Sequence, residues 1–568
     1  MIKLLLGVLF LSSLCTAGEW LQWSGDLHNH HNLTPANPKL SLENVNKLDV
    51  LWEFKSKNSV VATPTVKDGL IYFTDIAKAN LLGIFSTGRL YAVDAKTGQK
   101  VWSNKISDYN KVGVRNFSRS SPAIAGDLLI IGDSLNNTKF IVKALTSFKN
   151  IPGTSLMAIN RHTGKLVWRT IIDSHFASRT TMSPIVYGQQ IFVGVSSIES
   201  EIPAIRKASY PCCTFKGSLV SLDLATGRIL WKTPMIDPGL EHAGAPVWGN
   251  SPPIDVKRGR IYIGTGNNYQ ATTEMRQCML NAQSQPDYVE AKAILDCGMK
   301  TDVATNRFDS IVALDFKTGR IIWTRKTMYY DAWNVGCGSS FSSFPAPNKA
   351  CPKPQGIDAD FGQAPMFIQT GKGDLVVAGQ KNGRFWALNA EDGSVAWLHQ
   401  IGPRGKLGGH QWGSATDGKR IYFQVTNMEH EEITLSVGLY KGLTVRSGYW
   451  GALSVDTGEV LWETPDPDYI YPLKGEGLSH IVFGSDLGRG YFAAPMGPIT
   501  YYNKMLFAGS MSQKFYALNA QTGEIIWSKS VKGSVGSAPS IVDDVLYWGT
   551  GYHLGFAGNS VYALSLKP

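Results

Sequence analysis

One twelve-residue pattern recurs along the whole chain and restricts its fold more than any other feature. In each copy a strand of alternating apolar and polar residues leads into a turn, usually with Thr-Gly, and a second strand ends in Trp. Period-two alternation on both sides of a turn rich in Asp, Asn and Gly predicts a β-hairpin. Seven copies are complete: YAVDAKTGQKVW ending at Trp102, MAINRHTGKLVW at Trp168, VSLDLATGRILW at Trp231, VALDFKTGRIIW at Trp323, WALNAEDGSVAW at Trp397, GALSVDTGEVLW at Trp462 and YALNAQTGEIIW at Trp527.

Segments between the copies and at the two ends complete the pattern. Strand-like stretches such as LIYFTD and IYIGTG lie between the hairpins, which gives about four strands per unit. DVLWEF at residues 49–54 and SVYALSL at residues 560–566 are the two halves of an eighth hairpin. Their pairing would close the ring and remove its open sheet edges. We therefore predict an all-β, eight-bladed β-propeller closed by its N- and C-terminal strands, with the repeated Trp residues packed between blades.

The predicted domain organisation is a leader followed by one propeller. Residues 1–17 combine Lys3, an apolar run and a small residue at Ala17, which is typical of a secretory signal peptide. The bulky Leu14 argues against a lipid anchor at Cys15. Residues 18–568 are expected to form a single propeller with an insertion at about residues 270–302. No later stretch is apolar enough for a membrane span, so we expect an exported protein, periplasmic in a Gram-negative bacterium and otherwise secreted.

Charge and cysteine content narrow the class further. The net charge of +10 is spread without a dense Lys/Arg run, which gives no support for nucleic-acid binding. Six of the seven cysteines follow the predicted leader, and an even number in an exported chain implies disulfides. Fifteen pairings are possible, and proximity favours Cys212 with Cys213, Cys278 with Cys297, and Cys337 with Cys351.

The repeated Thr-Gly-x-x-x-Trp hairpin resembles the pyrroloquinoline quinone (PQQ) repeat of quinoprotein alcohol dehydrogenases over nearly the whole mature chain. This resemblance implies PQQ and Ca²⁺ as cofactors and an alcohol or polyol as substrate. The chain has no Cys-x-x-Cys-His haem motif, so electrons would pass to a separate acceptor such as a cytochrome c. Four segments look like the polyvinyl alcohol dehydrogenase-like branch: WSGDLHNHHN, CCTFKGSLVSLD, DADFGQAPM and HQWGSATDGKRIY.

The resemblance also implies which residues contact the quinone. In this family a disulfide between adjacent cysteines lies against one face of the ring, and an indole stacks on the other. Lys381 in AGQKNGRFWALN stands where the family keeps Arg or Lys against the quinone oxygens. The segments TTMSP and SRSSP resemble those that bind cofactor oxygens. The expected cofactor-binding residues are Cys212, Cys213, Trp248, Lys381, Thr181 and Arg119.

The resemblance assigns the metal ligands but leaves the base open. Glu199 in GVSSIES and Asn267 in GTGNNY resemble the Ca²⁺ ligands, and oxygen donors of this kind suit that ion. The family's general base is an Asp in an Asp-Asn pair, whereas this chain has Thr305 before Asn. Asp302 and Asp309 are the nearby carboxylates that could replace it.

Two other functions remain open at this stage. Propellers with the same repeat also serve as non-catalytic assembly lipoproteins, so a degenerate propeller acting as a binding or assembly scaffold is the main alternative. A carbohydrate-binding or carbohydrate-active propeller is the other, although no carboxylate pair can be placed across an axial cleft. No Gly-x-Gly-x-x-Gly follows a strand into a helix, which leaves nicotinamide binding without support.

Overall fold

The computed structural model describes residues 18–76, 87–110, 116–135, 152–203, 210–338, 347–405, 407–467, 493–552 and 557–567. The predicted signal peptide lies outside the described residues.

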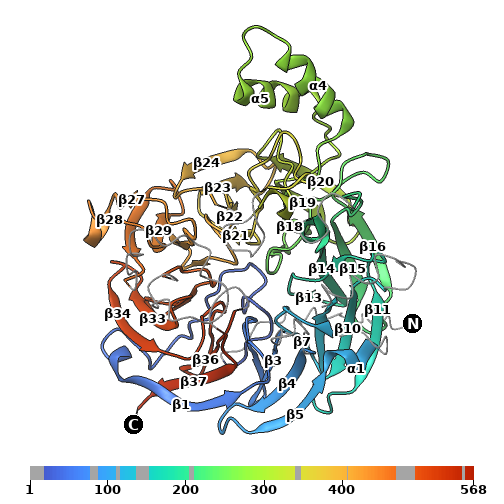
Figure 1. Cartoon of the computed structure of the whole chain (residues 1–568). Coiled ribbons are helices and arrows are strands. Elements are labelled where there is room, and N and C mark those ends of the chain that lie inside the picture. Colours follow the sequence, from blue (N-terminus) through green and yellow to red (C-terminus); the bar gives the residue numbers. More distant parts are fainter. Residues whose placement is uncertain are drawn as a thin grey trace, which may run out of the picture.

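Eight antiparallel blades of four strands each are arranged in a ring (Figure 1), and a short fifth strand, β12 (Ser178–Arg179), joins the blade that contains β14 (Gln190–Ser197). In seven blades the four strands follow chain order from the axis outward. The first four of these blades are β2 (Thr65–Lys67), β3 (Leu70–Thr74), β4 (Arg89–Asp94) and β5 (Lys100–Lys105); β7 (Ala123–Ala125), β8 (Leu128–Gly132), β10 (Ser155–Asn160) and β11 (Leu166–Ile171); β13 (Ile185–Tyr187), β14 (Gln190–Ser197), β15 (Ser218–Asp223) and β16 (Ile229–Pro234); and β17 (Ile254–Asp255), β18 (Arg260–Gly264), β19 (Ser310–Asp315) and β20 (Ile321–Lys326). The next three are β21 (Met366–Ile368), β22 (Leu375–Gly379), β23 (Arg384–Asn389) and β24 (Val395–Gln400); β25 (Ala415–Thr416), β26 (Arg420–Val425), β29 (Tyr449–Ser454) and β30 (Val460–Pro465); and β31 (Thr500–Tyr502), β32 (Met505–Ser510), β33 (Lys514–Asn519) and β34 (Ile525–Ser530).

The eighth blade joins the two ends of the described chain. Its strands are β35 (Ser540–Val542), β36 (Val545–Gly549), β37 (Ser560–Leu566) and β1 (Leu48–Lys55). Strand β1 pairs antiparallel with β37, from Leu48 opposite Leu566 to Lys55 opposite Ser560. The prediction of an eight-bladed ring closed by terminal strands is confirmed.

The repeated Trp residues fasten each blade to the next, as predicted. Seven of the eight indole N–H groups donate to a backbone carbonyl in the hairpin turn of the neighbouring blade, and that of Trp527 donates to the carbonyl of Leu48 at the start of β1, all at 2.9–3.2 Å. Trp323, for example, donates to the carbonyl of Ala390. Gly393 of the same turn lies against the Trp323 ring with φ of +71°, a conformation that glycine adopts without strain.

The inner two-thirds of each blade is buried because both of its faces pack on other blades. Strand β3, for example, has four consecutive buried residues, whereas the outermost strand β5 has none that are fully buried. The strands therefore carry continuous apolar runs instead of a simple alternation, as expected for sheets covered on both faces.

The N-terminal segment, residues 20–34, crosses one end of the ring. It exchanges backbone hydrogen bonds with the innermost strands of six blades: with Val66, Ile124, Ile254, Phe367, Thr416 and Tyr501. Trp20 and His31 of this segment are fully buried. Part of the dark blue trace accordingly runs through the middle of the ring in Figure 1.

The remaining elements lie in the connections between the blade strands. The insertion forms two helices, α4 (Thr273–Gln283) and α5 (Glu290–Lys300), which project from the ring (Figure 1) and are joined by the disulfide Cys278–Cys297. The disulfides Cys212–Cys213 and Cys337–Cys351 also form, so the pairing favoured by proximity is confirmed. Among the described helices, none is both long and apolar enough to cross a membrane. The short elements are β6 (Asn116–Phe117), β9 (Ser134–Leu135), β12 (Ser178–Arg179), β27 (Ile433–Thr434), β28 (Thr444–Val445), α1 (Ile106–Asn110), η1 (Val45–Lys47), η3 (Glu199–Glu201), η5 (Val335–Cys337) and η6 (Gly438–Tyr440).

Candidate active site

The predicted site residues lie in loops at the end of the ring opposite the N-terminal segment. Glu199, Asn267 and Lys381 follow the second strands of their blades, and Arg119, Thr181 and Trp248 precede the first strands. In an antiparallel blade the end of the second strand and the start of the first lie at the same edge. Six residues from four blades therefore face one end of the axis.

Trp248 and Lys381 are brought together, and a second indole links them to Arg119. The Nζ atom of Lys381 lies 5.2 Å from the centre of the Trp248 ring. Trp248 meets Trp412 edge to face at 5.4 Å, and the Arg119 guanidinium lies 4.6 Å from the Trp412 ring. Trp412 was not among the predicted site residues, although the segment HQWGSATDGKRIY that contains it had been singled out.

Arg119 and Thr181 line one cavity of about 340 Å³. Its wall also includes Trp412 and Asn250, and Trp23 of the N-terminal segment contributes from the other side. The Thr181 hydroxyl lies 2.9 Å from that of Ser196, which fixes its position in the wall. Arg119, Thr181 and Trp412 therefore line the same cavity, and Trp412 in turn contacts Trp248, which lies beside Lys381.

Lys381 is held by two buried carboxylates that sequence analysis did not assign to the site. Its Nζ atom lies 2.9 Å from Asp360 and 3.1 Å from Asp358, and all three side chains are at most 8% exposed. The paired carboxylates raise the pKa of Lys381 against the effect of burial, so the lysine keeps its charge. Asp360 also accepts the backbone N–H of Asn267 at 2.6 Å. One aspartate therefore connects the predicted cation and a predicted metal ligand.

Asp309 lies in the same acidic cluster. It is fully buried, adopts φ of +42°, and no N–H or O–H group of the described residues donates to its oxygens. Burial, with the carboxylates of Asp331 and Asp360 nearby, raises its pKa well above the usual range. Asp331 is anchored by the backbone N–H groups of residues 357–359. The pKa of Asp331 is also raised by burial, but three backbone N–H groups donate to its carboxylate whereas none of the described residues donates to that of Asp309.

Asp302 lies elsewhere, beside the insertion. It forms an ion pair with Lys326 and lines a second cavity of about 300 Å³ against α4. Three buried atoms of this cavity have no hydrogen-bond partner in the described chain: Oδ1 of Asn268, Oδ1 of Asn306 and Nδ1 of His242. A polar cavity with unpartnered groups is suited to a ligand or water that supplies hydrogen bonds. The two predicted catalytic carboxylates thus have different partners, Lys326 for Asp302, and Asp331 and Asp360 for Asp309.

Glu199 is bound to the loop that carries the adjacent cysteines. Its carboxylate accepts the Tyr210 hydroxyl at 2.6 Å, the Thr214 N–H at 2.9 Å and the Phe215 N–H at 2.7 Å. Cys213 in turn donates its N–H to the Gln270 side chain at 2.6 Å. Glu199, Cys212 and Cys213 are therefore brought together, by a hydrogen-bond network that was not predicted.

The donor chemistry fits a flat quinone and a hard cation at this end of the axis. Trp248 is only partly buried and lies beside a fixed ammonium group. The Asn267 amide donates to the carbonyls of Asn268 and Trp333, while its oxygen accepts no hydrogen bond from the described residues and is available to a cation. At Glu199 a cation would have to replace one existing donor, most simply the Tyr210 hydroxyl.

The fold and the repeats define the class of protein. The family model PQQ_2, described as outer membrane protein assembly factor BamB, matches residues 45–195, 141–325, 216–468 and 446–567. The chain belongs to this family of PQQ-repeat propellers, which confirms the predicted family.

Individual relatives come from bacteria. The chain is 28% identical over 573 residues to the polyvinylalcohol dehydrogenase of Sphingopyxis sp. (strain 113P3), covering 96% of this chain and 73% of that protein. It is 25% identical over 579 residues to the polyvinylalcohol dehydrogenase of Pseudomonas sp., covering 96% and 74%. Among solved structures, a europium-containing methanol dehydrogenase superposes with a TM-score of 0.62 at 14% identity, covering 97% of this chain and 98% of that one. At that identity the superposition supports the fold alone.

Proposed function

We propose that the protein is an exported quinoprotein dehydrogenase that oxidises alcohol groups with PQQ and Ca²⁺ and passes electrons to a separate acceptor such as a cytochrome c. The observation that carries the proposal is the buried Lys381, held by Asp358 and Asp360 with its ammonium group over the ring of the partly buried Trp248. Full-length similarity to two polyvinylalcohol dehydrogenases supports it. A scaffold would have no need for a desolvated cation beside an open indole.

Each predicted site residue has a role in this proposal. Trp248 and the Cys212–Cys213 disulfide hold the two faces of the quinone, and Lys381, Thr181 and Arg119 bind its polar edge. Asn267 and Glu199 bind Ca²⁺. When bound, the quinone accepts the reducing equivalents of the alcohol, and the cation polarises its carbonyl.

Asp309 is the proposed general base. Its carboxylate accepts the hydroxyl proton of the substrate, and the Asp331 carboxylate, fixed by three backbone N–H groups, stabilises the proton once it has arrived. Since the pKa of Asp309 is raised, the basic form becomes more abundant as pH rises, and alcohol oxidation should be faster at alkaline pH. Asp302, paired with Lys326, lies at the proposed substrate entrance and does not transfer the proton.

The cavity beside the insertion is the proposed substrate site. Its three unpartnered polar atoms can bind hydroxyl groups, and Asn268 directly follows the proposed metal ligand Asn267. An alcohol or polyol entering beside α4 would therefore approach the axis with its hydroxyl oriented. Helices α4 and α5 then decide which alcohols are accepted.

The proposed location is outside the cytoplasm. Three disulfides suit an oxidising compartment, which is the periplasm in a Gram-negative bacterium. Residues 1–17 are the proposed signal peptide, and residues 18–568 the proposed single propeller domain.

The test is reconstitution of the purified, chelator-treated protein. Addition of PQQ and Ca²⁺ together should produce stoichiometric quinone absorbance and dye-linked oxidation of alcohols. Cys213→Ser should weaken quinone binding at least about tenfold because one wall of the site is lost, whereas the double variant Cys278→Ser/Cys297→Ser should bind quinone as the parent does. Failure of the parent chain to bind quinone would favour the scaffold alternative, and equal binding by both cysteine variants would remove the disulfide from the site.

A further inference from the structure

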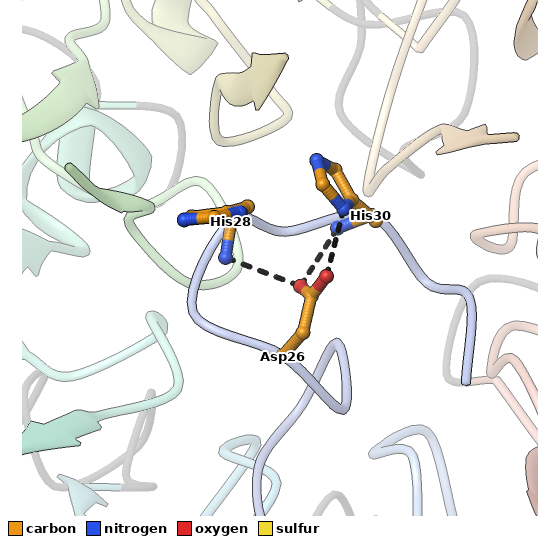
Figure 2. A group of neighbouring side chains, drawn as sticks. All are labelled: Asp26, His28 and His30. Carbon is orange, nitrogen blue, oxygen red and sulfur yellow. Dashed lines mark hydrogen bonds and ion pairs between the residues drawn. The ribbon is translucent and has the colours of Figure 1, made fainter. Parts of the chain in front are cut away.

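A second constellation of ligand-type side chains lies at the opposite end of the ring from the candidate active site. Asp26, His28 and His30 belong to the N-terminal segment and point toward one another (Figure 2). One carboxylate oxygen and one nitrogen from each imidazole lie within 4.8 Å of one another. This cluster is independent of the proposed alcohol oxidation.

The sequence Asp-x-His-x-His folds these groups together through backbone contacts. The Asp26 Oδ1 atom accepts the backbone N–H groups of His28 at 3.2 Å and His30 at 3.0 Å (Figure 2). The chain therefore curls around the carboxylate, and both rings are placed on its side. The turn is held in place because His28 and His30 also accept backbone hydrogen bonds from β21 and β25 through their carbonyls.

The His30 ring is oriented as a metal ligand would be. Its Nε2 atom lies 2.8 Å from the backbone carbonyl of Phe367, so this nitrogen carries a hydrogen and donates it. Its Nδ1 atom lies 2.8 Å from the Asp26 Oδ2 atom. Metal-bound histidines commonly donate the second ring nitrogen to a carbonyl in this way, which fixes the tautomer. Nδ1 of His30 and Oδ2 of Asp26 thus face each other at the place that a cation would take.

The third group, His28, packs its ring edge to face against His30 and Phe367 but leaves its ring nitrogens available, and the cluster is accessible. Neither ring nitrogen of His28 makes a hydrogen bond within the described residues. The Asp26 and His30 side chains are 21% and 25% exposed, so an ion can reach them from solvent. Two imidazoles and one carboxylate suit a borderline divalent ion such as Zn²⁺ and disfavour Ca²⁺, which prefers oxygen ligands.

We propose that Asp26, His28 and His30 bind one Zn²⁺ ion, with water as the fourth ligand. Since His30 is held by the Phe367 carbonyl of β21, the bound ion fastens the N-terminal segment to the ring. Binding releases the proton between His30 and Asp26, because nitrogen and oxygen bond to the metal in its place.

The experiment uses the full mature chain after chelator treatment. Incubation with excess ZnCl₂, removal of free ion and metal analysis should give one zinc per chain. His28→Gln should bind zinc at least about tenfold more weakly, because it removes one ligand while leaving the Asp26–His30 contact and both backbone hydrogen bonds intact. His162→Gln is the matched control: His162 lies 3.0 Å from Asp127 on an exposed surface without a second histidine, and its loss should leave zinc binding unchanged.

Two further measurements separate a metal site from a simple ion pair. Co²⁺ should give the intense visible absorption of tetrahedral coordination in the parent and not in His28→Gln, and one equivalent of Zn²⁺ should raise the Tm of the parent alone. Equal zinc content in the parent and His28→Gln, or no zinc in either, would overturn the proposal and leave the cluster as an ion pair that shapes the turn.

Discussion

The rim of the propeller repeats one contact from blade to blade, whereas its axial end combines residues that differ from blade to blade. At the rim, eight Trp residues each donate a hydrogen bond to a backbone carbonyl of the next blade, seven of them to equivalent hairpin turns and Trp527 to Leu48 at the start of β1. At the axial end, no two blades contribute the same group: Glu199, Trp248, Asn267, Asp309 and Lys381 come from loops that differ in length and sequence.

This difference implies that the residues that stabilise the fold are not the residues that carry out the reaction. Because the same contact is repeated around the rim, the loss of one contact removes only a small part of the stabilisation that the rim provides. The axial groups are buried charges and unpartnered polar atoms, which cost folding energy and are kept where they serve a reaction. Substitutions at the rim should therefore lower stability with activity per folded molecule unchanged, and substitutions at the axis should have their main effect on activity.

Asp309→Asn should give the largest effect. Asn has nearly the same shape but cannot accept the substrate proton, so kcat of the reconstituted enzyme should fall about 100- to 10,000-fold. Circular dichroism should show a folded protein, because Asn keeps the shape of the side chain and no N–H or O–H group of the described residues donates to the Asp309 oxygens. Asp302→Asn is the control and should lose less than about tenfold; comparable losses in the two variants would contradict the assignment.

Gly393→Ala tests the rim and should lower its stability. A Cβ atom there would lie 2.6 Å from the Trp323 ring, and φ of +71° adds strain, so we expect a loss of about 1–3 kcal/mol in unfolding free energy. Urea unfolding measures this. Gly371→Ala, whose Cβ would meet nothing within 4 Å, should be neutral. A fall in activity per folded Gly393→Ala molecule would contradict the expectation that rim substitutions leave activity unchanged.

The pH dependence of stability should report the axial acid. Because the pKa of Asp309 is higher in the folded than in the unfolded chain, its stabilising contribution is complete at low pH and is lost as pH rises through the folded pKa. The cofactor-free protein should lose up to about 1.4 kcal/mol per pH unit between the unfolded pKa of an aspartate, about 3.9, and the raised folded pKa, and nothing further above the folded pKa. Thermal unfolding followed from pH 4 upward should show a shallower decline in Asp309→Asn than in the parent.

Trp323→Phe should give the smallest effect. It removes the indole hydrogen bond to Ala390, at 3.2 Å, and should cost about 1 kcal/mol with no change in activity. The same substitution at Trp397, which donates to Val455 at 2.9 Å, should cost about the same if the repeats are energetically equivalent. Urea unfolding of the two variants under identical conditions compares them, and costs that differ severalfold would show that the rim is not uniform.

Much of the candidate site was predictable because each residue lies at a fixed place in a repeat. Trp248 and Lys381 were expected together and lie within 5.2 Å. Asp331, Asp358 and Asp360 were not predicted as site residues. Asp358 and Asp360 lie in the quoted segment DADFGQAPM, but nothing in that segment shows that their carboxylates meet Lys381, and Asp331 is a single Asp in a loop. The helices of the insertion were also not predicted; only its length and its cysteines signalled it.

The sequence by itself determined the eight-bladed ring, its closure by the terminal strands and the three disulfides, because hairpin periodicity, turn chemistry and cysteine spacing are local properties. Only the tertiary structure decided which carboxylate joins Lys381, that Glu199 binds the cysteine loop, and that the N-terminal segment crosses the far end of the axis. Those contacts join residues that are up to hundreds of positions apart, and their energies depend on burial and distance, which no local pattern encodes.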